Sequence, residues 1–221
     1  MAFNLAEIFY QRADSQPNQL VILGPHEDTR ITYGAFQRDI QRLAEQLHTA
    51  GIHAGMNIGL HYPSSQTYIA FTYALWTCGA SVTPIPVELA HEEQQQILHH
   101  IAIDAMISTQ RLKDVWTPFI LGKAVELTEP AELLTLKKCR ESPSQLAQLN
   151  PAFIRFTSGT TGDAKGVVLS HETIYQRIQA ANQGLHLCST DRIVWLLSMA
   201  YHFAVSIVAY LTFGEIGRAH V

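Results

Sequence analysis

The order of residues along this 221-residue chain predicts an α/β fold with mostly parallel sheets flanked by helices. Short segments rich in Val, Ile and Leu alternate with longer segments whose apolar residues recur every three or four positions. Strands that are joined through helices run parallel, and helices then cover both faces of the sheet. Hydrophobic residues make up 47% of the chain, which is typical of a globular protein with a sizeable core.

The first elements follow from apolar spacing and turn residues. A small apolar stripe predicts a helix that ends before Pro17. A strand is expected at residues 20–23, and its return strand at residues 30–32, with a turn rich in Gly, Pro and Asp between them.

Thr32 is a suitable N-cap for the next helix, and Gly51 is a suitable stop. The apolar face of that helix is formed by Phe36, Ile40, Leu43, Ala44 and Leu47. A strand at 57–62 and a helix at 64–78 complete a second unit. This helix is apolar nearly all round, which places it in the interior.

The middle of the chain continues the alternation and then loses it. A helix with one polar face is expected at 92–101, and a strand at 105–108. Between residues 110 and 148 the periodicity weakens, so we expect a surface connection with short elements.

The last third of the chain predicts one more amphipathic helix and one more strand. The helix is marked by Ile174, Ile178, Ala181 and Leu185 and should end near Gly184. The strand is expected at 191–197. Residues 195–214 lack Asp, Glu, Lys and Arg and would just span a bilayer, but polar residues such as Ser198 and Thr212 interrupt them. We therefore expect a buried strand and a buried helix, and no integral membrane segment.

Composition narrows the function classes. The net charge of −4 gives no support for a nucleic-acid partner. The three cysteines, Cys78, Cys139 and Cys188, form no Cys-x-x-Cys pair and are typical of reduced thiols. None of the eleven histidines has the spacing of a metal site, since Tyr175 stands where His171-Glu172 would need a second histidine. With no signal peptide at the N-terminus, these features predict a cytoplasmic protein without a metal site of its own.

The segment 153–171 carries the strongest functional signal. Apolar segments flank a centre of glycines, hydroxyl side chains and one lysine, which predicts a strand, a loop and a second strand. Glycines allow the backbone to approach a phosphate closely, and amides, hydroxyls and an ammonium group bind it. The candidate phosphate-binding residues are Thr157, Ser158, Gly159, Thr160, Thr161, Gly162, Lys165 and Gly166.

Two common loops do not fit this segment. A P-loop needs Gly-Lys-Ser/Thr, but Lys165 follows Ala164 and precedes Gly166. A hydrolase nucleophile elbow needs glycine two residues before Ser158, where Phe156 stands. The remaining alternative is a surface hairpin whose glycines only make turns.

The order Thr-Ser-Gly-Thr-Thr-Gly-x-x-Lys-Gly resembles the phosphate loop of the adenylate-forming (ANL) superfamily, which includes acyl- and aryl-CoA synthetases, luciferases and adenylation domains of peptide synthetases. The segments 31–36 and 78–85 resemble two further family landmarks. Ala164 departs from the family's usual proline before the lysine, without loss of a hydrogen-bond donor. His202, in the segment 199–203, lies where the family has a substrate-pocket motif. A buried core histidine is the alternative there.

The resemblance implies the incomplete N-terminal domain of an adenylate-forming enzyme. Such an enzyme uses ATP and Mg²⁺ to activate a small-molecule carboxylic acid to an acyl-adenylate, and then transfers the acyl group to a thiol, coenzyme A or an acyl carrier. The family's ribose, magnesium and lid motifs do not occur here. We therefore expect no catalytic residue in this fragment, and no acyl-adenylate formation by the chain as given.

Two alternatives to an acyl- or aryl-CoA synthetase stay open. An amino-acid adenylation domain of a peptide synthetase would place an acidic residue near residues 200–203, but residues 192–214 contain no Asp or Glu. A non-catalytic nucleotide-binding module is the second alternative.

The last seven residues, 215–221, break the pattern. They can be encoded by GAGATCGGAAGAGCACACGTC, whose body matches a widely used sequencing adapter. We therefore expect a partial AMP-binding domain at 1–214 and an adapter artefact at 215–221. A break there should leave an apolar run open to solvent and favour association: Phe203, Val205, Ile207, Val208, Tyr210, Leu211 and Phe213.

Overall fold

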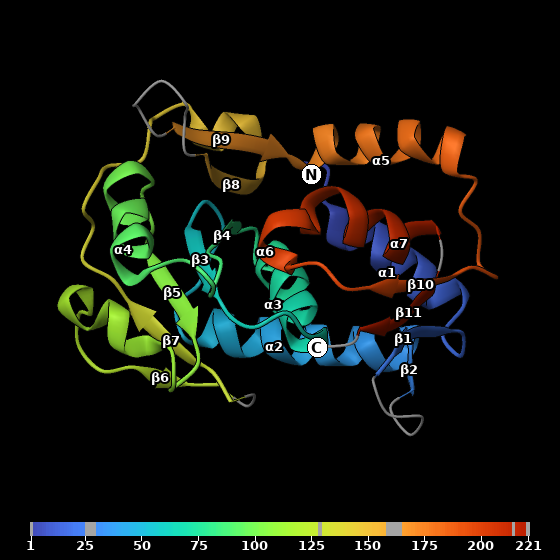
Figure 1. Ribbon diagram of the computed structural model, residues 1–221, viewed down its shortest axis with the longest axis horizontal. Helices are drawn as coiled ribbons and strands as arrows, with labels where there is room; N and C mark the ends of the chain where they lie inside the picture. The colour runs from blue at the N-terminus through green and yellow to red at the C-terminus, as the bar shows by residue number, and fades with distance from the viewer. Residues whose placement is uncertain (1, 25–29, 128–129, 158–164, 214, 220–221) are drawn as a thin grey trace.

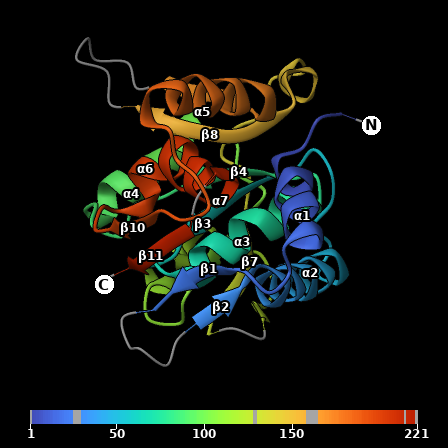
Figure 2. The ribbon, with the colours of Figure 1, turned by 90° about the vertical axis from the view of Figure 1, so that its right-hand side faces the viewer.

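The computed structural model describes residues 2–24, 30–127, 130–157, 165–213 and 215–219. Their strands form two sheets, one of seven strands in the order β6-β7-β5-β3-β4-β8-β9 and one of four strands in the order β10-β11-β1-β2 (Figure 1). Helices lie beside and between the sheets, as the second view shows (Figure 2). The α/β fold class is confirmed.

The centre of the larger sheet is parallel. Its inner strands are β5 (Ala105–Ser108), β3 (Asn57–His61), β4 (Ser81–Pro84) and β8 (Pro151–Thr157), and each neighbouring pair runs in the same direction. Antiparallel strands lie at both edges: β6 (Val125–Glu126) and β7 (Glu132–Thr135) on one side, and β9 (Lys165–Ser170) on the other. The three innermost strands are fully buried because helices cover both faces.

The smaller sheet joins the two ends of the chain. It contains β1 (Leu20–Leu23), β2 (Arg30–Thr32), β10 (Arg192–Trp195) and β11 (Glu215–Ala219). The last of these, β11, lies between β10 and β1 and is parallel to both. It falls within residues 215–221, which we expect to be a sequencing-adapter artefact. The pairing of β11 with β10 and β1 does not test whether adapter DNA encodes these residues, so the adapter origin stays a prediction.

Side-chain caps begin most of the helices. These are α1 (Leu5–Ser15), α2 (Tyr33–Thr49), α3 (Gln66–Thr77), α4 (His91–His100) and α5 (His171–Leu185). Asn4, Thr32, Ser65 and Ser170 each accept a hydrogen bond from a backbone N–H of the first turn of α1, α2, α3 and α5, respectively. The predicted cap at Thr32 is thus confirmed. The predicted stop at Gly51, whose φ is +95°, fits the left-handed region that glycine tolerates.

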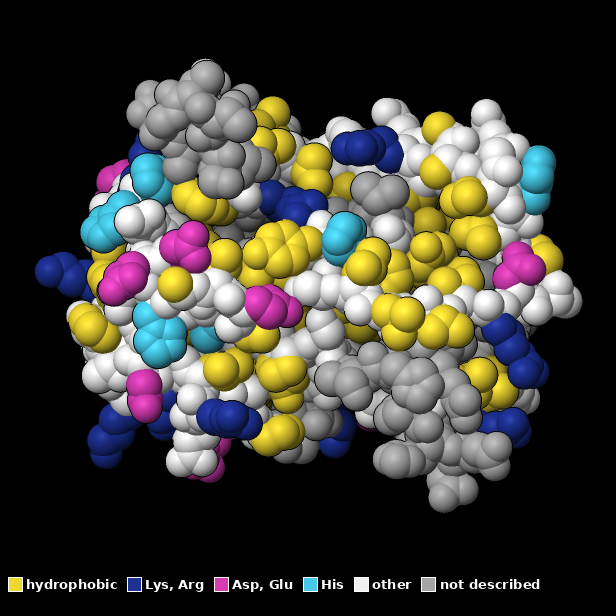
Figure 3. Space-filling view, viewed as in Figure 1, with side chains coloured by type: hydrophobic (Ala, Val, Ile, Leu, Met, Phe, Trp, Pro, Cys, Tyr) yellow, Lys and Arg dark blue, Asp and Glu magenta, His cyan; other side chains and the backbone are white. Residues whose placement is uncertain are grey.

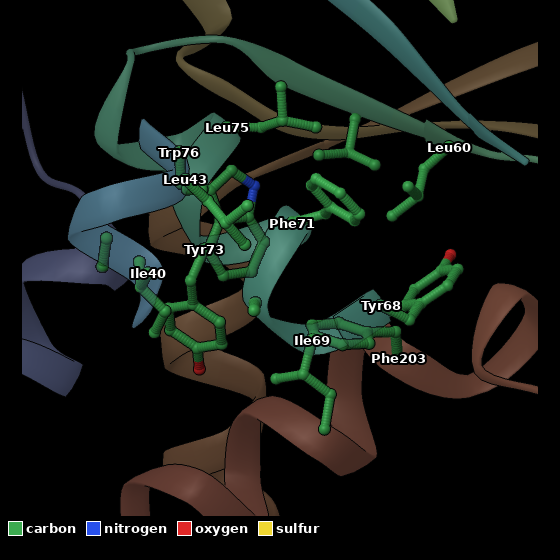
Figure 4. Packing of buried hydrophobic residues seen from close by; sticks show 14 of the residues in the cluster. Ile40, Leu43, Leu60, Tyr68, Ile69, Phe71, Tyr73, Leu75, Trp76 and Phe203 are labelled. Atoms are coloured by element: carbon green, nitrogen blue, oxygen red, sulfur yellow. The ribbon is translucent and has the colours of Figure 1, made fainter. Parts of the chain in front are cut away.

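Helix α3 is the centre of the core, as its apolar sequence predicts. Nine of its twelve residues are buried. Figure 4 shows its aromatic side chains packed among Ile40 and Leu43 of α2 and Phe203 from near the end of the chain. The Nε1–H of Trp76 donates to the carbonyl oxygen of Ala152 at 3.0 Å, which ties α3 to β8.

The segment 110–148 is more buried than the sequence indicates, so the expected surface connection is wrong in part. Strand β7 extends the sheet beside β5, with Leu133 and Leu134 buried. Trp116, in the 3₁₀ helix Lys113–Phe119, is fully buried and donates from Nε1 to Nδ1 of His61 at 2.9 Å. Elements this short show no detectable period, and their burial depends on partners distant in sequence. A second 3₁₀ helix spans Leu146–Leu149.

The end of the chain also corrects two expectations. Instead of one helix, the structure has α6 (Met199–His202), a π-helical turn (Phe203–Ile207) and α7 (Val208–Phe213). Of the apolar run expected to be open, four residues are buried: Phe203, Ile207, Val208 and Leu211. Tyr210 and Phe213 are half-buried, and the side chain of Val205 lies outside the described residues. None of the described helices is long and apolar enough to span a membrane.

Helix α5 ends one residue later than expected, at Leu185, with His186 in the left-handed region at φ 55°. Its apolar stripe is shorter than the sequence indicates. Ile174 and Ile178 are buried, but Leu185 is exposed.

Candidate functional site

Strands β8 and β9 form an antiparallel hairpin, which confirms the two predicted strands, while the predicted loop between them lies outside the described residues. Thr157 pairs with Lys165, and Phe156 with Gly166. Because β8 is parallel to β4 through Val82 and Phe153, the end of β8 at Thr157 lies at the carboxyl edge of the parallel strands. Ligands in open α/β sheets bind at this edge.

The predicted phosphate-binding residues fall on and around this tip. Ser158, Gly159, Thr160, Thr161 and Gly162 lie outside the described residues, as do the side chains of Thr157 and Lys165. The described part is the base of the loop. There a Cβ atom on Gly166 would lie 3.4 Å from Cγ1 of Ile101, an ordinary van der Waals contact, so β9 passes beside the end of α4 without requiring glycine at this position.

Arg155 lies on β8, two residues before Thr157, and was not among the predicted site residues. Its Nη2 donates to the carbonyl oxygen of Tyr201 at 2.7 Å and to that of Ala200 at 3.5 Å. Burial lowers the pKa of its guanidinium, while nearby Tyr68 and Tyr201 oppose that shift. The sequence motif begins after this residue, and only the fold brings residue 155 beside residues 200 and 201.

His202 is exposed on α6, so the alternative of a buried core histidine is wrong. Its ring lies 6.2 Å from the ring of Trp195. The start of α6 is fixed by a hydrogen bond from the Met199 N–H to the Ser64 hydroxyl at 2.9 Å. His202 therefore stands on a segment that is anchored at its start and, through the two carbonyls that Arg155 binds, to the hairpin strand.

Acidic and hydroxyl groups also approach this segment. The hydroxyl of Tyr68 is buried and has no hydrogen-bond partner among the described residues. Burial raises its pKa, the charge of Arg155 lowers it, and that of Glu88 raises it. The pKa of Tyr201 is raised by burial and then by Glu88 and Glu93. Sequence reasoning missed these two carboxylates because they belong to the turn and helix after β4, far from residues 192–214.

The described residues contain no group of three or more His, Cys, Asp or Glu side chains that could hold a metal ion. Cys78, Cys139 and Cys188 are all free thiols. Figure 3 shows hydrophobic side chains gathered over α6 and β10. The exposed members near this face are Val194, Leu196, Leu197 and Tyr201.

Comparison with known proteins gives one family. A model of the AMP-binding enzyme family matches residues 9–220. Among individual relatives, the chain is 27% identical to the nonribosomal peptide synthetase easA of Emericella nidulans, over 92% of this chain and 3% of that protein. It is 26% identical to the long-chain-fatty-acid–CoA ligase FadD13 of Mycobacterium tuberculosis, over 94% of this chain and 43% of that protein.

Solved structures show the same fold. A long-chain-fatty-acid-CoA ligase from Archaeoglobus fulgidus superimposes with a TM-score of 0.78 at 22% identity, over 97% of this chain and 46% of that one. The N-terminal domain of FACL13 from Mycobacterium tuberculosis superimposes with a TM-score of 0.78 at 21% identity, over 99% of this chain and 57% of that one. The chain thus spans about half the length of these structures.

Proposed function

The chain belongs to the AMP-binding enzyme family, whose members form adenylates, and on that basis we propose that its β8–β9 hairpin holds the phosphates of ATP while a carboxylic acid is activated. The observation that carries the proposal is the position of β8, the strand that leads into the glycine- and threonine-rich segment and that ends at the carboxyl edge of the parallel strands. Lys165 is the one lysine or arginine between Arg155 and Arg177.

In this reaction the substrate carboxylate attacks the α-phosphate of ATP, and an acyl-adenylate and pyrophosphate form. The hairpin would bind the β- and γ-phosphates through backbone amides, hydroxyls and the Lys165 ammonium group, and so stabilise charge that develops on the leaving pyrophosphate. Mg²⁺, when bound, would supply further neutralisation of that charge.

The acyl part of the substrate is proposed to lie along α6, near His202. We take coenzyme A as the thiol that accepts the acyl group, and the cytoplasm as the compartment in which three free cysteines stay reduced. These finer assignments rest on the family and on the relatives named as CoA ligases.

A second candidate is the activation of an amino acid for transfer to a carrier-protein thiol. Several relatives are named as nonribosomal peptide synthetases. The absence of acidic residues from 192–214 counts against this candidate, but Glu88 and Glu93 influence Tyr201 from another part of the fold. Either carboxylate could meet a substrate ammonium group.

Binding of MgATP to the chain tests the first half of the proposal. Lys165→Ala should weaken binding in isothermal titration calorimetry by about tenfold or more, as loss of a charge-assisted contact implies. Lys123→Ala is the control, because Lys123 is exposed and lies far from the hairpin in sequence. Equal affinities of the two variants would contradict the role of Lys165.

Acid-dependent exchange between pyrophosphate and ATP, measured on a full-length enzyme that contains this chain, tests the chemistry. A panel of fatty, aryl and amino acids separates the two candidates. Exchange with fatty or aryl acids alone supports the CoA-ligase function. Exchange only with amino acids, reduced in Glu88→Gln, supports the second.

A further inference from the structure

Arg155 makes contacts that a strand residue in a simple hairpin does not need. Its backbone pairs with Val167 across the hairpin, and its Nη2 reaches two carbonyls of α6, those of Tyr201 at 2.7 Å and Ala200 at 3.5 Å. A charged donor strengthens such bonds, and partial burial limits competition from water. The strand of the phosphate loop and the segment of His202 are therefore held by one side chain.

The carbonyls that Arg155 binds lie just before a change of helix type. Met199–His202 is α-helical, and Phe203–Ile207 is a π-helical turn. At such a change the hydrogen-bond spacing lengthens by one residue, and a carbonyl is left without its usual partner in the helix. Arg155 satisfies acceptors at this point, so its removal should affect α6 more than the strand on which it lies.

The other contacts of α6 lead into the core. Its first N–H, that of Met199, donates to Ser64, and the following Phe203 packs its ring 5.7 Å from that of Tyr68 and 5.8 Å from that of Phe153. These contacts fix the segment against α3 and the sheet. Arg155 adds the link to the hairpin.

We propose that Arg155 is a positioning residue that couples the phosphate loop to α6, so that a nucleotide bound at the hairpin orders the segment carrying His202. This inference rests on the proposed function of the hairpin. Arg155 itself touches neither phosphate nor acyl group in the proposal. It stabilises α6 through its hydrogen bonds to the Tyr201 and Ala200 carbonyls.

Hydrogen exchange measured by mass spectrometry on the full 221-residue chain tests the coupling. Without nucleotide, Arg155→Met should speed exchange of the amides at 199–203 by about tenfold, as expected from the loss of one charge-assisted hydrogen bond. Arg12→Met is the matched control, since Nη1 of Arg12 donates to the Thr212 carbonyl of α7 at 2.6 Å, away from the hairpin. It should speed exchange in α7 and not at 199–203.

The second readout separates coupling from simple support. In the wild-type chain, MgATP should slow exchange at 199–203. In Arg155→Met it should still bind but no longer slow exchange there, and Arg155→Lys should restore part of the effect. If MgATP binds Arg155→Met and protects 199–203 as in the wild type, the coupling is wrong while the proposed function stands. If the wild-type chain shows no MgATP binding, the proposed coupling and the proposed function of the hairpin are both wrong.

Discussion

Two buried histidines, His61 and His171, are neutral because burial disfavours the charged imidazolium form. Nδ1 of His61 accepts from Trp116, and Nδ1 of His171 accepts from the Leu5 N–H at 3.2 Å. Each ring therefore carries its proton on Nε2. Burial lowers the pKa of both residues from 6.5 to about 4.

This burial predicts loss of stability in acid. A histidine whose folded pKa lies below its unfolded pKa binds its proton more tightly in the unfolded chain, so stability present above pH 6.5 is lost as the pH falls toward 4. Each such histidine accounts for on the order of 3 kcal/mol over that range. The free energy of unfolding, measured with urea between pH 7.5 and 4.5, should show this loss. His61→Asn keeps an acceptor for Trp116 and should flatten the dependence, whereas His99→Gln, at an exposed site, should not.

Gly79 offers a second test at the scale of one residue. Its φ is +73°, and a Cβ atom there would lie 2.9 Å from Cβ and 3.2 Å from Cα of Ala54. Gly79→Ala should therefore lower the free energy of unfolding by about 2–4 kcal/mol through backbone strain and overpacking together. Gly51→Ala has the strain at φ +95° but meets no atom within 4 Å, so thermal unfolding should show a smaller loss. Equal losses would exclude the clash as a cause.

At the scale of elements, α3 determines how the hairpin strand β8 is placed. Its Trp76 packs against Phe153 with ring centroids 5.2 Å apart and donates to the Ala152 carbonyl. Both contacts act on the strand that leads to the phosphate loop. The position of β8 therefore depends on the most apolar helix of the chain.

Trp76→Phe should remove the hydrogen bond to the Ala152 carbonyl, at a cost of about 0.5–1.5 kcal/mol. Trp195→Phe is an informative control. Trp195 is also buried, but its Nε1–H has no partner among the described residues, so the same change removes no hydrogen bond. Urea denaturation of both variants would compare them. A Trp195→Phe loss as large as that of Trp76→Phe would show that ring volume, not the hydrogen bond, sets the cost.

At the scale of the whole molecule, exposed apolar side chains gather beside the candidate site. Val194, Leu196 and Leu197 are 57%, 70% and 53% exposed. Val194 lies on strand β10, at the edge of the smaller sheet, and Leu196 and Leu197 follow that strand. Edge strands with apolar surface favour association.

We expect the chain to self-associate through this face as its concentration rises. The double variant Leu196→Lys, Leu197→Ser should reduce association in sedimentation velocity, because a charge and a polar group replace exposed apolar surface. Leu185→Ser is the control, since Leu185 is 61% exposed on α5 and not part of β10 or its continuation. Association that persists in the double variant and falls in Leu185→Ser would place the interface on α5.

Features that depend on neighbours along the chain could be predicted from the sequence. The cap at Thr32, the stop at Gly51, the buried character of α3 and the hairpin around Gly166 follow from local propensity, periodicity and turn residues. The phosphate-loop motif likewise indicated the family, which the match over residues 9–220 supports.

Which distant side chains meet depends on the tertiary fold. Three examples join residues 46 or more positions apart, and hydrophobic periodicity in the sequence indicates none of them. They are the burial of Trp116 against His61, the hydrogen bond from Arg155 to Tyr201, and the electrostatic effect of Glu88 and Glu93 on Tyr201. The same reason explains why Phe203 and Leu211 are buried while Leu196 is exposed. Burial stabilises an apolar side chain, but the tertiary fold determines which other residues bury it.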